Sequence, residues 1–154
     1  MKYHNQPVEI DGYRFDSELE RKCYEYLKCG ISGSDYIVKA HTEAIALMPP
    51  GNTLSPSNKF RAITWKPDFF VYRTKGIAES SLIIEIKGCE TTDFLLKMNL
   101  ASRLAIWDKI IFCYKSAQAA YTSKMQKYGA TVTYPALLPT VALQKLVEIE
   151  HGKH

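Results

Sequence analysis

Apolar and charged residues combine in an unusual way in the central stretch SLIIEIKG. Side chains alternate between the two faces of a strand, so Leu82, Ile84 and Ile86 would share one face and Glu85 and Lys87 the other. An apolar strand with a carboxylate and an ammonium group on one face predicts either a salt-bridged sheet edge or a catalytic site.

The same patterning predicts the elements of the N-terminal half. PVEIDGYRF reads as a hairpin that turns at Asp11-Gly12, and residues 16–30 read as a helix that Gly30 terminates. A strand is predicted over residues 37–47. PPGNTLSPSNKFRAIT is rich in Pro, Gly, Ser and Asn, which predicts a long loop, and TWKPDFFVY reads as the next strand.

A strand–helix–strand unit dominates the C-terminal half. A turn near Lys75-Gly76 would make TWKPDFFVY and SLIIEIKG antiparallel neighbours. TTDFLLKMNLASRLAIW is predicted to be a long helix and KIIFCYK a buried strand, which together give a right-handed parallel crossover. A helix that ends at Gly129, an edge strand TVTY and a last helix PTVALQKLVEIEHG follow. The expected fold class is α/β or α+β, with a mixed sheet flanked by helices.

Composition narrows the functional classes only slightly. The chain has 154 residues, which suits one domain, and a net charge of +4, which is compatible with a polyanionic partner without establishing one. The four cysteines lack CxxC spacing, so reduced thiols are expected rather than a zinc site. No signal peptide or membrane span is apparent, so we expect a soluble, cytoplasmic protein without membrane association.

Two carboxylates are predicted to meet on adjacent strands. Asp68 follows Pro67 at the start of an apolar run, and an antiparallel pairing with the next strand would bring Asp68 close to Glu85. Paired carboxylates form a hard-oxygen site that suits Mg²⁺. Lys87 on the same face would stabilise negative charge on phosphorus or help to activate a water, which is the layout needed for phosphodiester hydrolysis.

These residues resemble a known nuclease pattern. PDFFVY followed by LIIEIKG is similar to the PD-(D/E)XK nuclease superfamily, with the match on Pro67, Asp68, Glu85 and Lys87. The stretches FDSELE and KGCETTDFLLK look like small phage-encoded proteins of endonuclease I type within it. The resemblance covers roughly residues 2–115.

The resemblance implies a restriction-endonuclease-like core, in the order α-β-β-β-α-β. The chain would then be a single nuclease domain over residues 1–154. Its core would span about residues 13–115, and residues 116–154 would form an extension that either caps the core or dimerises.

The resemblance also implies roles for individual residues. Asp68 and Glu85 would be the main metal ligands, Glu20 would complete the metal site, and Lys87 would be the catalytic lysine. Lys97 would reach a substrate phosphate. In the loop of residues 49–64, Lys59 and Arg61 are further candidates for phosphate contacts.

The expected function is therefore a Mg²⁺-dependent DNA endonuclease, with Mn²⁺ as a substitute. The resemblance favours branched DNA such as Holliday junctions, a homodimer that makes paired nicks, and a phage or prophage origin in a bacterial host. The alternatives are a sequence-specific or transposon-type nicking nuclease, a nucleic-acid-binding module that does not cut, and an accessory protein that acts through protein partners.

Each candidate residue also has a purely structural interpretation. Ser17 and Glu20 fit a capping box, in which Glu20 reaches back to the cap amide. Glu85 and Lys87 could form an exposed ion pair, which would stabilise the fold by only about 0–1 kcal/mol. Lys97, Lys59 and Arg61 could be ordinary surface cations. His41 and Glu43 share a predicted strand face, where a solvated surface is favoured over a second metal site.

Overall fold

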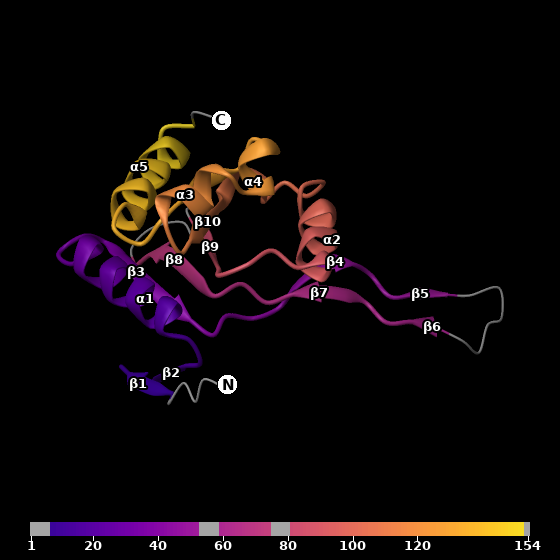
Figure 1. Ribbon diagram of the computed structural model, residues 1–154, viewed down its shortest axis with the longest axis horizontal. Coiled ribbons are helices and arrows are strands. Elements are labelled where there is room, and N and C mark those ends of the chain that lie inside the picture. Colours follow the sequence, from indigo (N-terminus) through magenta and orange to yellow (C-terminus); the bar gives the residue numbers. More distant parts are fainter. Residues whose placement is uncertain (1–6, 53–58, 75–80, 153–154) are drawn as a thin grey trace.

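A five-stranded mixed sheet forms the centre of the computed structural model, which describes residues 7–52, 59–74 and 81–152 (Figure 1). The strand order is β11-β10-β9-β8-β3. The five strands are β3 (Tyr36–Ala40), β8 (Phe69–Arg73), β9 (Leu82–Lys87), β10 (Ile110–Tyr114) and β11 (Thr131–Thr133). Strands β9, β10 and β11 run parallel, whereas β8 is antiparallel to both β9 and β3. The fold is α/β, as predicted, and both TVTY as a strand at the sheet edge and the parallel crossover are confirmed.

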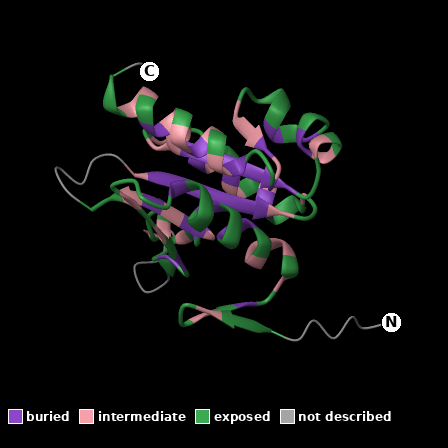
Figure 2. Cartoon of the chain, turned by 90° about the vertical axis from the view of Figure 1, so that its left-hand side faces the viewer, coloured by how far each residue is buried: buried purple, intermediate pink, exposed green. Residues whose placement is uncertain are grey.

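Helices cover both faces of this sheet, and the most buried residues lie between them (Figure 2). The first face packs against α1 (Glu18–Ile31) and α5 (Leu138–Glu150). The second face packs against α2 (Thr92–Ala101), α3 (Ala117–Tyr121) and α4 (Lys124–Lys127). Alternation along β9 explains the division: Leu82, Ile84 and Ile86 face α1 and α5, and Ile83 faces α2.

A narrow two-stranded arm extends away from the sheet (Figure 1). Its base pairs β4 (Ile45–Met48) with β7 (Ile63–Trp65), and further out β5 (Gly51–Asn52) pairs with β6 (Lys59–Phe60). The prediction of one long loop over residues 49–64 is therefore wrong for the paired residues. Pro and Gly indicated turns there, but the cross-strand pairing is a tertiary feature that composition does not reveal.

Two predicted strands are each divided in two. The predicted strand 37–47 is interrupted at His41, whose φ of 51° lies in the left-handed region and ends the extended backbone. TWKPDFFVY is interrupted at Lys66-Pro67-Asp68, where proline lacks an amide hydrogen for the ladder. Both interruptions mark the point where the arm leaves the sheet. The predicted turn at Lys75-Gly76 lies outside the described residues.

Two predicted helices are shorter than expected. The helix predicted over TTDFLLKMNLASRLAIW ends at Ala101, and a 3₁₀ turn, η1 (Trp107–Lys109), precedes β10. The helix predicted over SAQAAYTSKMQKYG divides into α3 and α4, because Ser123 caps a new helix by accepting a hydrogen bond from the Gln126 amide. The N-terminal hairpin, β1 (Val8–Ile10) and β2 (Tyr13–Phe15), is confirmed, with Asp11 and Gly12 both at positive φ.

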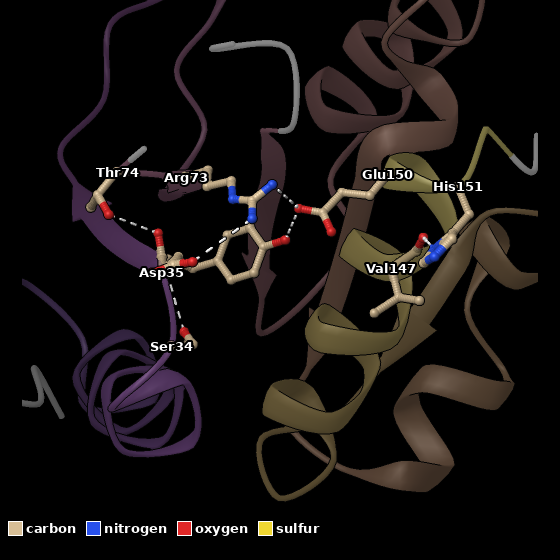
Figure 3. A network of polar contacts seen from close by, with 8 residues as sticks. Ser34, Asp35, Arg73, Thr74, Val147, Glu150 and His151 are labelled. Atoms are coloured by element: carbon tan, nitrogen blue, oxygen red, sulfur yellow. Dashed lines mark hydrogen bonds and ion pairs between the residues drawn. The ribbon is translucent and has the colours of Figure 1, made fainter. Parts of the chain in front are cut away.

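Helix α5 belongs to the same core as the central sheet. Its side chains Leu138, Ala142 and Leu146 are fully buried against the first face. A polar network also joins it to the sheet (Figure 3): the Arg73 guanidinium lies 3.3 Å from a Glu150 carboxylate oxygen, and the Tyr36 hydroxyl donates to the same carboxylate. Of the two roles expected for the C-terminal extension, these contacts identify capping of the core for α5.

Gly30 lies inside α1 and does not terminate it, contrary to the prediction. A Cβ atom at this position would lie 2.2 Å from the Cβ of Pro139, so glycine is what allows α5 to approach α1.

We expect Gly30→Ala to lower the free energy of unfolding by about 1–3 kcal/mol, because the methyl group would force the two helices apart. Alanine is otherwise favoured over glycine in a helix by about 1 kcal/mol. A decrease in the free energy of unfolding would therefore point to the contact with Pro139. Chemical denaturation measures the effect. Gly51→Ala, which meets no atom within 4 Å, is the control and should be close to neutral; a stabilised Gly30→Ala protein would contradict the packing.

Candidate active site

Asp68 and Glu85 lie across from each other at one end of the sheet. The antiparallel register pairs Phe69 with Ile84, so Asp68, one residue earlier, lies opposite Glu85. One Asp68 carboxylate oxygen, Oδ2, accepts a hydrogen bond of 2.7 Å from the Ile86 amide. The Glu85 residue is only 5% exposed. The predicted meeting of the two carboxylates is thus present in the structure.

Burial and mutual repulsion make both carboxylates harder to ionise. Burial is the largest cause that raises the pKa of Asp68, and the neighbouring Glu85 carboxylate raises it further, to about 8. Burial likewise raises the pKa of Glu85, although the adjacent Lys87 ammonium opposes that shift. Two carboxylates held in this way form a site that would gain from a nearby cation.

Lys87 completes the cluster from the same strand. Its Nζ lies 3.0 Å from Glu85 Oε1, and it also lies 4.4 Å from the centre of the Phe94 ring. Strand β9 runs between β10 and β8, so an ion pair at an exposed sheet edge is excluded. The pair is instead largely enclosed, with its ammonium held by a carboxylate and an aromatic face.

Glu20 approaches the pair from the first turn of α1. The Ser17 hydroxyl accepts a hydrogen bond of 3.1 Å from the Glu20 amide, which forms one half of the predicted capping box. Within the described residues, no hydrogen bond joins the Glu20 carboxylate back to the Ser17 amide, so the other half is not made. The Glu20 carboxylate instead raises the pKa of both Asp68 and Glu85 by repulsion, which places it near them.

An open pocket of about 230 Å³ lies beside these acids. Glu20 and Asp68 both line it, together with His41 and Lys66. His41 holds a left-handed backbone and packs its ring against Tyr13 and Phe15, at centroid distances of 5.7 and 5.9 Å. Asp16 is a third acid in its lining, so a molecule that enters the pocket from solvent meets three acidic and two basic side chains.

The donor chemistry of this site fits a hard divalent cation. Among the residues that the structure describes, no three Asp, Glu, His or Cys side chains lie together as a closed cage for a metal ion. Mg²⁺ usually takes only one or two protein carboxylates and keeps several waters, so Asp68 and Glu85 suffice in number and kind. A positive charge there would offset the burial that raises the pKa of both carboxylates, and also the repulsion of Glu85 on Asp68.

Among the described residues, no hydrogen bond or ion pair joins the three predicted phosphate contacts to Asp68, Glu85 or Lys87. Lys97 on α2 pairs with Asp93 one turn earlier, at 3.3 Å from Nζ to Oδ2. Lys59 and Arg61 are exposed on the arm, beyond its base at β7. Glu43 is exposed as well, and within the described residues it shares no metal-binding group with His41.

Several contributors to the site, Lys66 in the pocket lining among them, were not predicted from the sequence. The Trp65 indole N–H donates to Glu85 Oε2 at 3.0 Å, which fixes the second carboxylate oxygen. His41 lines the pocket only because the backbone turns there. Tyr114 lies beside Lys87 in the parallel register of β10 and β9, and its hydroxyl donates a hydrogen bond of 2.7 Å to Glu90. The sequence signal for Trp65 is its position next to a proline-interrupted strand, but this position does not indicate which side chain the indole contacts.

Comparison with known proteins gives a family but no established function. A search of the curated proteins found no match to this chain. No helix in the described residues is long and apolar enough to cross a membrane. Residues 1–130 match DUF1064, a family described as a protein of unknown function, and this match includes Glu20, Asp68, Glu85 and Lys87. Because the match covers most of its length, the chain belongs to the DUF1064 family.

Proposed function

We propose that this protein is a Mg²⁺-dependent DNA endonuclease that hydrolyses phosphodiester bonds. The observation that supports it most is the half-buried Asp68 opposite the buried Glu85, with the Lys87 ammonium 3.0 Å from Glu85. Buried carboxylates with raised pKa values are costly to a fold, so their presence beside a pocket favours a functional role. The order α1, β3, β8, β9, α2 and β10 also agrees with the expected nuclease core.

Asp68 and Glu85 would hold the cation, with Glu20 adding negative charge from the pocket side. The cation would supply positive charge toward a phosphodiester and would acidify a water. Trp65 fixes one oxygen of Glu85 and the Ile86 amide fixes one oxygen of Asp68, so both carboxylates are oriented in advance. Lys87, anchored between Glu85 and Phe94, would orient the attacking water and stabilise negative charge on the phosphate oxygens.

Branched DNA is the proposed substrate, with a homodimer delivering paired nicks that leave 5′-phosphates. These features rest on the resemblance to endonuclease I-type proteins. The projecting arm (Figure 1) supports contact with DNA outside the site, because Lys59 and Arg61 are exposed residues of its chain. Lys97 is proposed to meet a phosphate once the strand displaces Asp93 as its partner.

We expect the double variant Lys59→Ala/Arg61→Ala to bind junction DNA about 5- to 30-fold more weakly at low salt, with the binding difference fading as salt rises. Both side chains are exposed, so folding should be unchanged. Fluorescence anisotropy over a salt series measures the effect. Lys22→Ala on α1 is the control. Unchanged binding by the double variant would show that the arm does not contact DNA.

A substrate panel tests the proposed activity. Four-way junction, linear duplex and single-stranded DNA are each incubated with Mg²⁺, with Mn²⁺ and with EDTA. We expect preferential cutting of the junction in either metal and none in EDTA. Equal cutting of all three substrates would exclude junction selectivity. Binding of DNA without any cutting would instead favour a module that retains the fold but does not cleave.

A further inference from the structure

Residues 115–128, termed here the α3–α4 segment, form a surface of positive charge without acids. Lys115, Lys124 and Lys127 are exposed, and no ion pair joins any of them to another described residue. In the sequence, no Asp or Glu occurs between Asp108 and Glu148. The Glu90 carboxylate lies next to the segment and accepts hydrogen bonds from the Lys124 backbone amide, but it forms no ion pair with these three side chains. The three exposed ammonium groups therefore give the segment a local positive potential that is suited to a polyanion.

Two exposed tyrosines lie within the same segment. Tyr121 is 63% exposed and Tyr128 is 65% exposed, whereas Tyr24, one of the core tyrosines, is only 3% exposed. Exposed aromatic rings interleaved with lysines form the kind of surface on which unpaired bases stack while the lysines neutralise phosphates. A paired duplex does not offer its base faces in this way.

The fold attaches this segment to the edge of the candidate active site. Segment residues directly follow β10, whose Tyr114 lies beside Lys87 in the parallel register. Glu90, three residues after Lys87, accepts hydrogen bonds from the Tyr114 hydroxyl at 2.7 Å and from the Lys124 amide at 3.0 Å. Burial is the largest cause that raises the pKa of Tyr114, and the Glu90 and Glu85 carboxylates raise it further.

We propose that the α3–α4 segment binds a single-stranded stretch of DNA that runs toward the Asp68–Glu85 site. Lys124 and Lys127 would contact successive phosphates, and Tyr121 and Tyr128 would stack on unpaired bases. The proposal rests on the proposed function in taking the ligand to be the strand that is cut. Among branched DNA substrates, it favours those whose nucleotides at the branch point, next to the scissile bond, are unpaired.

Binding in EDTA, where no cutting is expected, separates this proposal from the cleavage proposal. The probe is a fluorescein-labelled single-stranded DNA oligonucleotide, and its dissociation constant is measured by anisotropy over a salt series. For Lys124→Ala/Lys127→Ala we expect weaker binding and a salt slope smaller by about 1.4, since each phosphate contact on a single strand contributes about 0.7. For Tyr121→Ala/Tyr128→Ala we expect binding to weaken by about 30-fold or more, which is about 5-fold or more for each of two stacked bases, with the salt slope unchanged.

The matched control is Lys22→Ala/Tyr26→Ala, a lysine and a tyrosine that are also exposed but lie on α1, on the other face of the sheet. It should bind as the wild type does. Tyr121→Phe/Tyr128→Phe should restore binding, because phenylalanine retains the stacking face. Wild-type binding by the Lys124/Lys127 variant, an equal loss in the α1 control, or failure of phenylalanine to restore binding would overturn the proposal. These outcomes are independent of whether the protein cleaves DNA.

Discussion

Replacement of Lys87 with Met should slow DNA cleavage by about 10²- to 10³-fold, the usual loss when one charged or hydrogen-bonding group that stabilises a transition state is removed. Methionine keeps the unbranched stem over Phe94 but lacks the ammonium that lies 3.0 Å from Glu85 Oε1. Single-turnover cleavage in saturating Mg²⁺ measures the effect on the chemical step.

Removal of the ammonium also leaves the buried Glu85 without its cation, so the stability of the variant must be measured in parallel. Lys145→Met is the matched control, because Lys145 is also a partly enclosed, ion-paired lysine, 3.8 Å from Glu148 on α5. The control should cleave at the wild-type rate. A folded Lys87→Met protein that cuts as fast as the control would show that Lys87 is structural.

Replacement of Asp68 with Asn should stabilise the protein. It should also abolish the rise in melting temperature that we expect from divalent cations. The asparagine oxygen can still accept the hydrogen bond from the Ile86 amide, but the repulsion from Glu85 and Glu20 is gone. We expect a gain of about 1–2 kcal/mol in EDTA near neutral pH, or about 2–8 °C in melting temperature for a chain of this size. Many enzymes have a lower free energy of unfolding because their active sites hold charged groups close together.

The pH dependence of this gain has a defined sign. The pKa of Asp68 is raised to about 8 in the folded protein from 3.8 in the unfolded chain, so between these values the folded state binds more protons. Wild-type stability in EDTA therefore falls as the pH rises through that range, and the advantage of Asp68→Asn shrinks as the pH falls. Differential scanning calorimetry at several pH values, with Asp35→Asn as control, measures it. A destabilised variant at pH 8 would contradict the repulsion.

Mg²⁺ or Mn²⁺ should raise the melting temperature of the wild type, because a ligand that binds only the folded state stabilises it by mass action. The same salts should leave Asp68→Asn nearly unchanged. A similar shift in both proteins would indicate cation binding elsewhere. This readout does not depend on the DNA substrate, so it remains informative if the proposed substrate is wrong.

Strand alternation was sufficient to predict the centre of the site. In SLIIEIKG the apolar residues at every second position placed Glu85 and Lys87 on one face, and the antiparallel pairing then brought Asp68 opposite Glu85. Both inferences depend only on the period of a strand and on the order of two neighbouring strands. These local rules hold because β8 and β9 are consecutive in the sheet.

The parts that were not predicted depend on long-range packing. Trp65 reaches Glu85 from β7 at the base of the arm, and no pattern in the sequence encodes that approach. His41 lines the pocket because its backbone adopts a positive φ at a strand break, which is uncommon for a residue with a side chain. A glycine at the end of a helical pattern usually predicts a helix stop, but Gly30 lies inside α1, where the close approach of Pro139 requires it.

The most direct test of the central claim compares the wild type with Glu85→Gln on four-way junction DNA in Mg²⁺. Glutamine keeps the size of the side chain and can still accept from Trp65, but it removes the charge of the buried carboxylate. Glu9→Gln, at an exposed position on β1, controls for the chemistry of the change. Cleavage by the wild type and by Glu9→Gln, and none by a folded Glu85→Gln protein, is the predicted result. Equal cleavage by all three proteins, or none by the wild type in Mg²⁺ or Mn²⁺, would contradict a metal-dependent nuclease site at Asp68 and Glu85.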